Sequence, residues 1–417
     1  MDRAYKILLS PCSMSLKPFD LNLRHLRALA AIVAHGSMSA AAQAVNLSQP
    51  ALTQGLAKIE RQLGTSLFDR RADGVRPTQS GLLMAERVGA ALDHLAEATR
   101  SGLRGGGRGF ARPDLLMTAT QLHAFLSLVE AGSFAGAAIR TGITQPALHR
   151  AVRDLEQLCG VPLAERSGRG LVVTSAGRKL ARGVRLAAAE IGAAIGEISP
   201  DPGIGSGITI GAMPLSRALL LPAAIASLVR AESRAAIDVR EGSWRELVDP
   251  LRDGSIDLMV GALRDPPPAG LRQDHLFEDR LVVVARAGHP LAAIPDPTLA
   301  DYARYGWIIG HGDTPLRQHW QDLFAGATLP LAPIECGSVM VIRGVLHQSD
   351  LLTLLSPEQV AIEMESGALC QIGPPLHHGE RPIGITTREG WRPTGVQQRF
   401  IEMLREAARA TRLQESE

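Results

Sequence analysis

One segment of this chain occurs twice, and the duplication constrains the fold more than any other feature. The matching residues keep a single offset of 96 positions, with no insertion between them. Two copies at so long a period indicate a duplicated domain and not a solenoid, which stacks shorter units. The matches are Gly36-Ser37-Met38 with Gly132-Ser133-Phe134, Gln49-Pro50-Ala51-Leu52 with Gln145-Pro146-Ala147-Leu148, Glu60 with Glu156, Gly64 with Gly160, Arg70 with Arg166, Thr78 with Thr174, and Gly81 with Gly177.

Hydrophobic periodicity and capping residues predict the same layout in each copy: three short helices, a β-hairpin and a long helix. A glycine ends the first helix and a serine caps the second; a serine in the first copy, or a threonine in the second, stands two residues before a proline at the start of the third. In the first copy we expect helices over about 23–33, 38–45 and 49–63, a hairpin over 69–78, and a long helix over 79–100. The second copy repeats this layout from Thr120 to about Ile198.

Changes in composition predict the domain boundaries. A flexible segment rich in glycine and arginine follows the first copy, and a segment rich in proline and glycine follows the second over 199–207. The expected domains are a first helix-turn-helix domain with its long helix at 21–100, a linker at 101–117, a second such domain at 118–198, and an α/β domain at 206–412.

The last part of the chain alternates strands and helices, which predicts an open, largely parallel sheet flanked by helices. Expected strands include 208–211, 236–240, 257–261 and 281–285, and Ile383–Thr387 is expected to return to the first sheet before a terminal helix from about Thr394. The fold class is therefore multidomain: two all-α winged helix-turn-helix domains followed by an α/β domain of two lobes. Lobe I is expected at about 206–288 and 380–412, and lobe II at about 289–379.

Charge is distributed unevenly along the chain, although its net charge is only +2. Residues 21–100 carry 9 basic and 6 acidic side chains, residues 101–200 carry 12 and 7, and residues 201–417 carry 20 and 27. A basic front half is typical of a segment that binds a polyanion, and the acidic half would avoid one.

Several classes of protein are disfavoured by what the sequence lacks. The apolar run Ile7-Leu8-Leu9 is too short for a signal-peptide core, so a cytoplasmic location is expected, and Met14 is an alternative start. No Cys/His cluster has metal-site spacing and no nucleophile or phosphate-loop motif occurs, so we expect no metal, no cofactor and no enzymatic activity. The four cysteines, Cys12, Cys159, Cys336 and Cys370, are expected to be reduced thiols.

The third helix of each copy carries side chains suited to reading DNA. In a helix-turn-helix the second helix of the motif enters the major groove, where glutamine can pair with adenine and arginine with guanine. Arginines of the hairpin would hold phosphates and set the register without reading sequence. The candidate DNA-binding residues are Ser48, Gln49, Pro50, Thr53, Gln54, Arg70, Arg71 and Arg76 in the first copy, and Thr144, Gln145, Pro146, His149, Arg150, Arg166 and Arg169 in the second.

These motifs resemble the winged helix-turn-helix of LysR-type transcriptional regulators. The acidic half is also similar to the effector domain of that family, in Asp257–Gly261 and in the run from Leu276 to Leu291. The resemblance covers nearly the whole chain. The helix-turn-helix motifs are Gly36 to Ala42, Leu47 to Thr53, Ile59-Glu60 with Leu63-Gly64 and Leu67-Phe68-x-Arg70, and Pro77-Thr78-x-x-Gly81, and the second copy matches from Gly132 to Gly177.

The chain departs from the family pattern in carrying two helix-turn-helix units, since family members usually have one and a dimer supplies the second. Gln54 stands where the family often has arginine, and Gly55 lies inside a helix, where it costs about 0.5–1 kcal/mol relative to alanine. In the second copy His149 replaces a usual serine or threonine, and Ala164 replaces the phenylalanine that Phe68 retains. Either copy could therefore keep phosphate contacts and lose specific readout.

The resemblance implies that a small molecule binds between the two lobes. Polar groups at helix N-termini suit an anionic ligand, so an organic acid or a sugar-like molecule is the expected effector. Each hydroxyl has the alternative interpretation of a simple helix cap. The candidate effector-binding residues are Pro214, Leu215, Ser216, Ala262, Thr314 and Ser338, with Arg317 and His311 as weaker ones.

The sequence thus predicts a transcription regulator that binds double-stranded DNA, responds to a small molecule and forms a homo-oligomer through its long helices. An alternative hypothesis is a small-molecule-binding module whose duplicated helical front end serves oligomerisation, with weak or vestigial DNA binding. Specific binding that exceeds nonspecific binding by a factor on the order of 10³ would separate the two.

Overall fold

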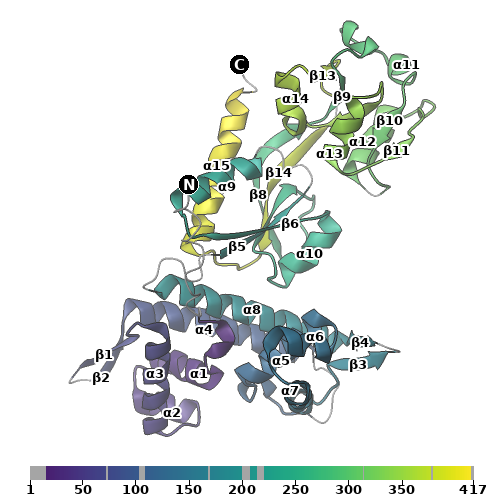
Figure 1. Ribbon diagram of the computed structural model, residues 1–417. Helices are drawn as coiled ribbons and strands as arrows, with labels where there is room; N and C mark the ends of the chain where they lie inside the picture. The colour runs from purple at the N-terminus through teal and green to yellow at the C-terminus, as the bar shows by residue number, and fades with distance from the viewer. Residues whose placement is uncertain are drawn as a thin grey trace, which may run out of the picture. The chain divides into compact units, whose positions relative to one another are not determined.

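The structure is a computed structural model that describes residues 16–71, 74–102, 109–167, 170–199, 207–213, 220–312, 314–376 and 379–414. The chain divides into two compact units, Met1–Ser206 and Gly207–Glu417 (Figure 1). Within the described ranges no single helix is long and apolar enough to cross a membrane; α5 (Ala119–Ala131) and α6 (Phe134–Thr141) pass that test jointly, but they are bent by 118°.

Each copy in the first unit has the predicted three helices, β-hairpin and long helix. The first copy is preceded by the short 3-10 helix η1 (Pro18–Asp20), and η2 (Pro113–Leu115) precedes the second. The elements of the first copy are α1 (Leu23–His35), α2 (Met38–Ala44), α3 (Gln49–Leu63), β1 (Phe68–Arg71), β2 (Gly74–Pro77) and α4 (Gln79–Gly102). Those of the second are α5 (Ala119–Ala131), α6 (Phe134–Thr141), α7 (Gln145–Cys159), β3 (Ala164–Ser167), β4 (Gly170–Val173) and α8 (Ser175–Ile198).

Residues that match between the copies make matching structural contacts. A carboxylate oxygen of Glu60 accepts the backbone N–H groups of Leu67 and Phe68, at 2.8 and 3.2 Å, and so ties α3 to the hairpin. Glu156 accepts the equivalent pair in the second copy, at 2.8 and 3.3 Å. The repeated glutamate therefore serves the fold by satisfying two backbone donors.

The repeated glycines at the start of the long helices are required by close packing. A Cβ atom on Gly81 would overlap the backbone oxygen of Leu67, and one on Gly177 would overlap that of Leu163. A threonine caps each long helix at its N-terminus. The hydroxyl of Thr78 accepts the N–H of Gly81 at 3.0 Å in α4, and that of Thr174 accepts the N–H of Gly177 at 3.0 Å in α8.

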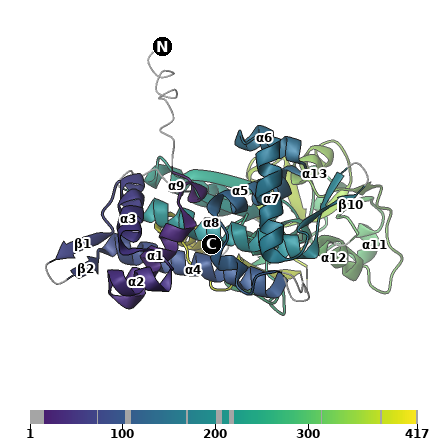
Figure 2. The ribbon, with the colours of Figure 1, turned by 90° about the horizontal axis from the view of Figure 1, so that it is seen from below.

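The long helices α4 and α8 pack against each other within the same chain and lie side by side in both ribbon views (Figures 1 and 2). Their direction is antiparallel: Arg87, early in α4, contacts Glu190 and Glu197, late in α8, while Ala98, late in α4, approaches Gly183, early in α8. The pairing of the two copies is thus made inside one chain.

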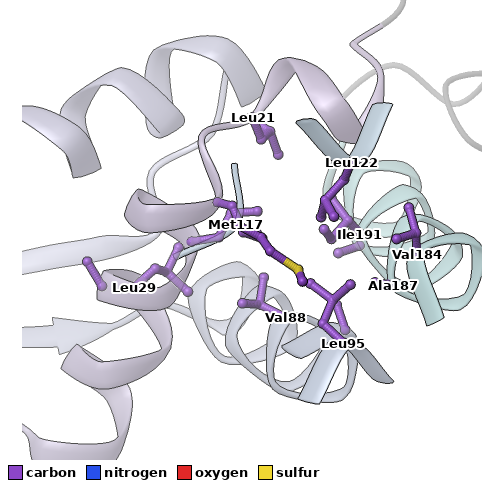
Figure 3. Packing of buried hydrophobic residues seen from close by; sticks show 14 of the residues in the cluster. Leu21, Leu29, Val88, Leu95, Met117, Leu122, Val184, Ala187 and Ile191 are labelled. Carbon is purple, nitrogen blue, oxygen red and sulfur yellow. The ribbon is translucent and has the colours of Figure 1, made fainter. Parts of the chain in front are cut away.

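A single hydrophobic core connects the two copies (Figure 3). Leu29 of α1 and Leu122 of α5 belong to the same cluster, and Met117, which precedes α5, is 2% exposed within it. The long helices contribute residues at equivalent positions: Met84 and Leu180, Val88 and Val184, Ala91 and Ala187, Leu95 and Ile191, and Ala98 and Ala194. Because the core is shared, the two copies are held in a fixed arrangement.

Lobe I of the second unit is a five-stranded sheet in the order β6-β5-β7-β14-β8. The strands β5, β6 and β7 run parallel, and β14 is antiparallel to both of its neighbours. Helices α9 and α15 pack together in the core of this lobe. The bounds are β5 (Gly207–Ala212), α9 (Leu220–Ala231), β6 (Ala236–Glu241), α10 (Trp244–Arg252), β7 (Leu258–Ala262), β8 (Leu271–Arg280), β14 (Glu380–Arg388) and α15 (Gly395–Gln414).

Lobe II is a second five-stranded sheet, in the order β11-β10-β12-β9-β13. The strands β10, β11 and β12 are parallel, whereas β9 runs antiparallel to β12 and β13. The bounds are β9 (Val282–Arg286), η4 (Pro290–Ala293), α11 (Leu299–Tyr302), β10 (Trp307–Ile309), α12 (Pro315–Leu323), β11 (Ile334–Glu335), α13 (Val339–Leu346), β12 (Leu352–Leu355), η5 (Pro357–Val360), α14 (Ala361–Glu365) and β13 (Leu369–Ile372).

The sheets differ from the sequence-based prediction in two respects. Each sheet is mixed, because β14 in lobe I and β9 in lobe II run opposite to the other four strands, so two of the four strand pairings in each sheet are antiparallel. The strand β9 falls in the range expected for lobe I, but its hydrogen bonds with β12 and β13 place it in the sheet of lobe II. The chain therefore crosses between the sheets at Leu281, directly after β8.

Candidate nucleic-acid interface and effector site

The first turns of α3 present the candidate reading residues of the first copy. Gln49, Pro50 and Gln54 are exposed, and Ser48 caps the helix by accepting the N–H of Ala51 at 3.4 Å. The hydroxyl of Thr53 donates to the backbone oxygen of Gln49 at 3.0 Å. Two glutamine amides are therefore the exposed groups on this helix that can both donate to and accept from a base edge.

The equivalent surface of α7 exposes different side chains. Gln145, Pro146 and Arg150 are exposed, and the side chain of Thr144 makes no capping hydrogen bond to the helix, in contrast to Ser48. The ring of His149 stacks on Phe134 of α6, with centroids 3.6 Å apart and planes inclined by 20°. The second copy thus presents a guanidinium where the first presents the amide of Gln54.

The glycine inside α3 has a packing reason. A Cβ on Gly55 would lie 2.7 Å from Cδ2 of His25 in α1, so the glycine makes room for the imidazole ring. At the matching positions of the second copy the chain has Ala151 and Gln121. Partial burial, with Lys58 and Arg24 as further causes, lowers the pKa of His25. The cost of the mid-helix glycine is therefore linked to a helix–helix contact that only the first copy makes.

Four of the candidate phosphate-binding arginines lie on the strands of the two hairpins. Arg70 and Arg71 lie on β1, Arg166 lies on β3, and Arg76 on β2 is exposed. Arg169 lies outside the described residues. The register pairs Arg70 with Val75 and Arg166 with Leu171, so the two repeated arginines occupy the same place in their hairpins.

The ends of the parallel strands in lobe I form one part of the candidate effector site. Ala262 ends β7 and is half-buried, and the N–H of Met213, after β5, donates to Val260 at 3.1 Å, which brings the two strand ends together. Arg264 lies over the ring of Trp244, 5.3 Å from its centroid. Pro214, Leu215 and Ser216, which were expected to complete this edge, lie outside the described residues.

In lobe II the parallel strands β10 and β11 bring two helix N-termini to the same edge. Thr314 accepts the N–H of Arg317 at 3.4 Å and donates to the oxygen of His311 at 2.8 Å. Ser338 accepts the N–H of Val341 at 3.5 Å. Both hydroxyls are thus helix caps, and Arg317 forms an ion pair with Glu335. An imidazole, His311, lies exposed between the two turns.

The sequence reasoning missed a buried ion pair where the chain passes between the lobes. Arg381 of β14 pairs with Asp279 of β8, and their side chains are 7% and 6% exposed. The Nε atom of Arg381 is buried and has no hydrogen-bond partner among the described residues, and burial lowers the pKa of this guanidinium. Arg381 is also close enough to His319 of α12 to contribute to lowering the pKa of that imidazole, after burial itself. No sequence signal links two residues 102 positions apart.

Comparison with protein families identifies both parts of the chain. Residues 23–82 and 119–178 each match the family described as "Bacterial regulatory helix-turn-helix protein, lysR family", and residues 204–409 match "LysR substrate binding domain". The chain belongs to the LysR family of transcriptional regulators. The duplication expected from the offset of 96 is confirmed, because the same family model matches twice.

Individual relatives support this assignment. The HTH-type transcriptional regulator GalR of Pseudomonas putida is 33% identical over 376 residues, which cover 88% of this chain and 93% of GalR. PcaQ of Agrobacterium fabrum is 26% identical over 294 residues, covering 69% of this chain and 94% of PcaQ. GalR is matched over most of this chain, whereas the PcaQ match leaves 31% of it unaligned.

Solved structures agree in fold. ArgP from Mycobacterium tuberculosis covers 69% of this chain and 96% of its own, with a TM-score of 0.56 and 23% identity. LysG from Corynebacterium glutamicum, solved with bound effector Arg, covers 70% and 97%, with a TM-score of 0.53 and 20% identity. This LysR-family regulator therefore combines a DNA-binding unit with an α/β effector-binding domain, and its front end is a tandem of two helix-turn-helix domains.

Proposed function

We propose that one chain of this regulator contacts two unlike DNA half-sites. The observation that carries the proposal is the antiparallel packing of α4 on α8, which fixes two helix-turn-helix domains in one chain. In dimeric helix-turn-helix proteins, the spacing of two recognition helices sets the spacing of two half-sites. Here both recognition helices come from the same chain, so a single subunit carries the two recognition helices that a dimer otherwise supplies.

The half-sites are proposed to be unlike because the exposed reading groups differ. Gln54 in the first copy is replaced by Arg150 in the second, and glutamine and arginine prefer adenine and guanine respectively. An identical glutamine begins each helix, Gln49 and Gln145. We place the stronger reader in the second copy, where the guanidinium is available, with the first copy reading adenine or holding phosphate.

Footprinting on the promoter region next to the gene would test this proposal. The full chain should protect two adjacent half-sites of different sequence, and one chain should suffice for both. The salt dependence should reflect several phosphate contacts, and specific binding should exceed nonspecific binding on the order of 10³-fold. Weak, sequence-blind binding at every salt concentration would instead favour a front end that serves oligomerisation alone.

For the effector we propose a small organic acid or a sugar-like molecule bound between the lobes, with the residues at the strand ends as contacts. Support comes from two helix N-termini at one edge, at Thr314 and Ser338, and from the buried Arg381, whose Nε has no partner within the described residues. Pro214, Leu215, Ser216 and Ala262 remain proposed contacts from lobe I. Thermal-shift screening of organic acids, with sugars as the comparison set, tests this class, because a ligand that prefers the native state raises its stability.

The remaining assignments are proposals of the same kind. We propose a cytoplasmic location, because the protein binds DNA. We also propose that it has no enzymatic activity, metal or cofactor, because the related proteins are named as regulators. We propose a homo-oligomer, and domain boundaries at 21–100, 101–117, 118–198 and 206–412. Light scattering on the full chain, with and without DNA, would give its oligomeric state.

A further inference from the structure

The interface between α4 and α8 has an apolar centre that does not distinguish one copy from the other. Val88 and Val184, Ala91 and Ala187, and Leu95 and Ile191 are pairs related by the offset of 96, and all six are buried. Such an interface is built from the same surface on both sides. By its apolar residues alone, a first copy could therefore pair with another first copy, and a second with another second.

The flanks of the interface do distinguish the copies. Arg87 lies 3.1 Å from a carboxylate oxygen of Glu190 and 2.7 Å from one of Glu197, and the side chains of Arg87 and Glu190 are 8% and 11% exposed. Hydrogen bonds to Glu197 and Glu190 raise the pKa of the guanidinium in spite of its burial. One end of the helix pair is thus joined by a buried cation between two carboxylates.

The opposite end has a glycine in place of that cation. By the offset of 96, Arg87 corresponds to Gly183, and Glu190 corresponds to His94. A Cβ on Gly183 would overlap that of Ala98 and would lie 2.8 Å from the backbone oxygen of His94. Equivalent positions therefore make different contacts at the two ends of the helix pair. At the Arg87 end long charged side chains fill the space between the helices, and at the Gly183 end the two backbones approach each other directly.

Pairing of like copies would break this complementarity. Two first copies would set Arg87 of each helix against His94 and Ser101, the counterparts of Glu190 and Glu197, so each buried guanidinium would lose both of the carboxylates that it contacts here. Two second copies would bring Glu190 and Glu197 of each helix against Gly183, so both ends would have a glycine at the position of Arg87. A buried charge that has lost its partner is strongly destabilising, so both like pairings are disfavoured.

We propose that Arg87, Glu190, Glu197 and Gly183 restrict the pairing of helix-turn-helix copies to the unlike pair, and that the DNA-binding unit closes within one chain. In an oligomer all copies are held at high effective concentration, so the tether between copies does not by itself select the partner. The charges on α4 and α8 make that selection. A second chain then associates through surfaces other than this helix pair.

The test compares three variants of the full-length protein by hydrogen exchange of the amides in α4 and α8. Variant one, Gly183→Arg/Glu190→His/Glu197→Ser, gives α8 the flanking residues of α4. Variant two, Arg87→Gly/His94→Glu/Ser101→Glu, does the reverse. Variant three combines all six substitutions, and so exchanges the flanks between the helices while conserving overall composition.

We expect variants one and two to exchange about tenfold faster or more in both helices, and variant three to return to within about threefold of the original protein. Arg100→Gln removes an ion pair with Glu97 in which both side chains are 65% exposed, and serves as the control with unchanged exchange. If the amides of α4 and α8 exchanged as slowly in variants one and two as in the original protein, the proposal would be overturned. So would failure of variant three to recover, since the flanks would then act singly and not as a matched set.

A double-mutant cycle keeps the proposal testable if variant three folds poorly. Arg87→Met and Glu190→Gln/Glu197→Gln are each expected to speed exchange in α4 and α8. Combining them should be less harmful than the product of the separate effects, because no buried charge is left unpaired. Strictly multiplicative effects would mean that the three groups are not coupled, and would equally overturn the proposal.

Discussion

The imidazole of His149 in α7 stacks on the phenyl ring of Phe134 in α6, with centroids 3.6 Å apart. At the matching position in α3, Thr53 donates its hydroxyl to the backbone oxygen of Gln49 at 3.0 Å. Each copy therefore engages this position in its own local contact, although the sequence suggests it for base reading in both. Gln54 and Arg150, one residue further along, are both exposed and also differ between the two helices.

The stacked ring predicts a separation of roles within α7. Arg150→Ala should weaken binding to specific DNA by about tenfold or more, as expected for loss of a bidentate arginine–base contact worth about 1–3 kcal/mol. His149→Ala should mainly lower stability, by about 0.5–1.5 kcal/mol, through loss of the aromatic pair. Electrophoretic shifts on specific and nonspecific DNA, with thermal unfolding of each variant, measure both effects. A loss of stability without loss of binding in Arg150→Ala would contradict this division.

The two half-sites should respond to different glutamines. Gln145→Ala, alone or with Arg150→Ala, is expected to remove protection from one half-site, because these residues lie on α7 alone. Gln49→Ala should alter the other half-site only if α3 also reads bases. Footprints of the wild type and of each variant provide the comparison, and an unchanged footprint after the combined Gln145→Ala and Arg150→Ala change would argue against the second copy as a reader.

Substituting the repeated glycine of the long helix should destabilise either copy. Gly81→Ala and Gly177→Ala each force a methyl group against a backbone oxygen, and overpacking of this kind costs about 1–3 kcal/mol. Gly89→Ala in the same helix α4 is the matched control, since a Cβ there meets nothing within 4 Å, and it should stabilise by about 0.5–1 kcal/mol. Urea unfolding of the full chain would measure all three, and equal effects at Gly81 and Gly89 would exclude the packing explanation.

The contact between Gly55 and His25 predicts rescue by the residues of the other copy. Gly55→Ala should lower stability, because the new methyl group would lie 2.7 Å from the imidazole. The double change Gly55→Ala/His25→Gln installs the pair that the second copy has at Ala151 and Gln121, and should recover most of the loss. Thermal unfolding distinguishes this from a general helix-propensity effect, under which Gly55→Ala alone would be stabilising.

Stability of the second unit should depend on pH through His289. This side chain is 2% exposed, its Nδ1 accepts the N–H of Leu291 at 3.1 Å, and burial lowers its pKa below the ordinary value of 6.5. Below pH 6.5 the unfolded chain therefore binds a proton that the folded chain excludes, so stability is lost as the pH falls and is regained above 6.5.

Urea unfolding at pH 5.5 and pH 7.5 would check the sign (both values chosen about one unit either side of the ordinary histidine pKa). The original protein should lose more stability on acidification than His289→Gln does. His35→Gln, at an exposed histidine of α1, is the control and should keep the pH dependence of the original. A steeper loss in His289→Gln than in the original protein would show that another group sets the dependence.

Much of the first unit was predictable because its signals are local. Caps such as Ser48 and Thr174, and glycines such as Gly64, fix helix ends through hydrogen bonds and backbone conformation within a few residues. Because the domain is duplicated, each helix boundary could be predicted twice, once from each copy. The α/β half was predicted less completely: β8, β11 and β13 were not expected as strands, and β9 was expected in the other lobe. Strand pairing depends on residues distant in sequence, and the local hydrophobic periodicity of a segment does not indicate which strand it will pair with.

The sequence by itself determined that this chain carries two copies of one DNA-binding domain before an α/β effector domain, because an offset of 96 with matching caps and glycines has no other economical explanation. Only the tertiary structure decided that the two long helices pair with each other inside the chain. It also showed that Arg87 lies between Glu190 and Glu197, and that His149 is stacked on Phe134. Those relationships join residues brought together by packing of separate elements, and no local pattern encodes which surfaces will meet.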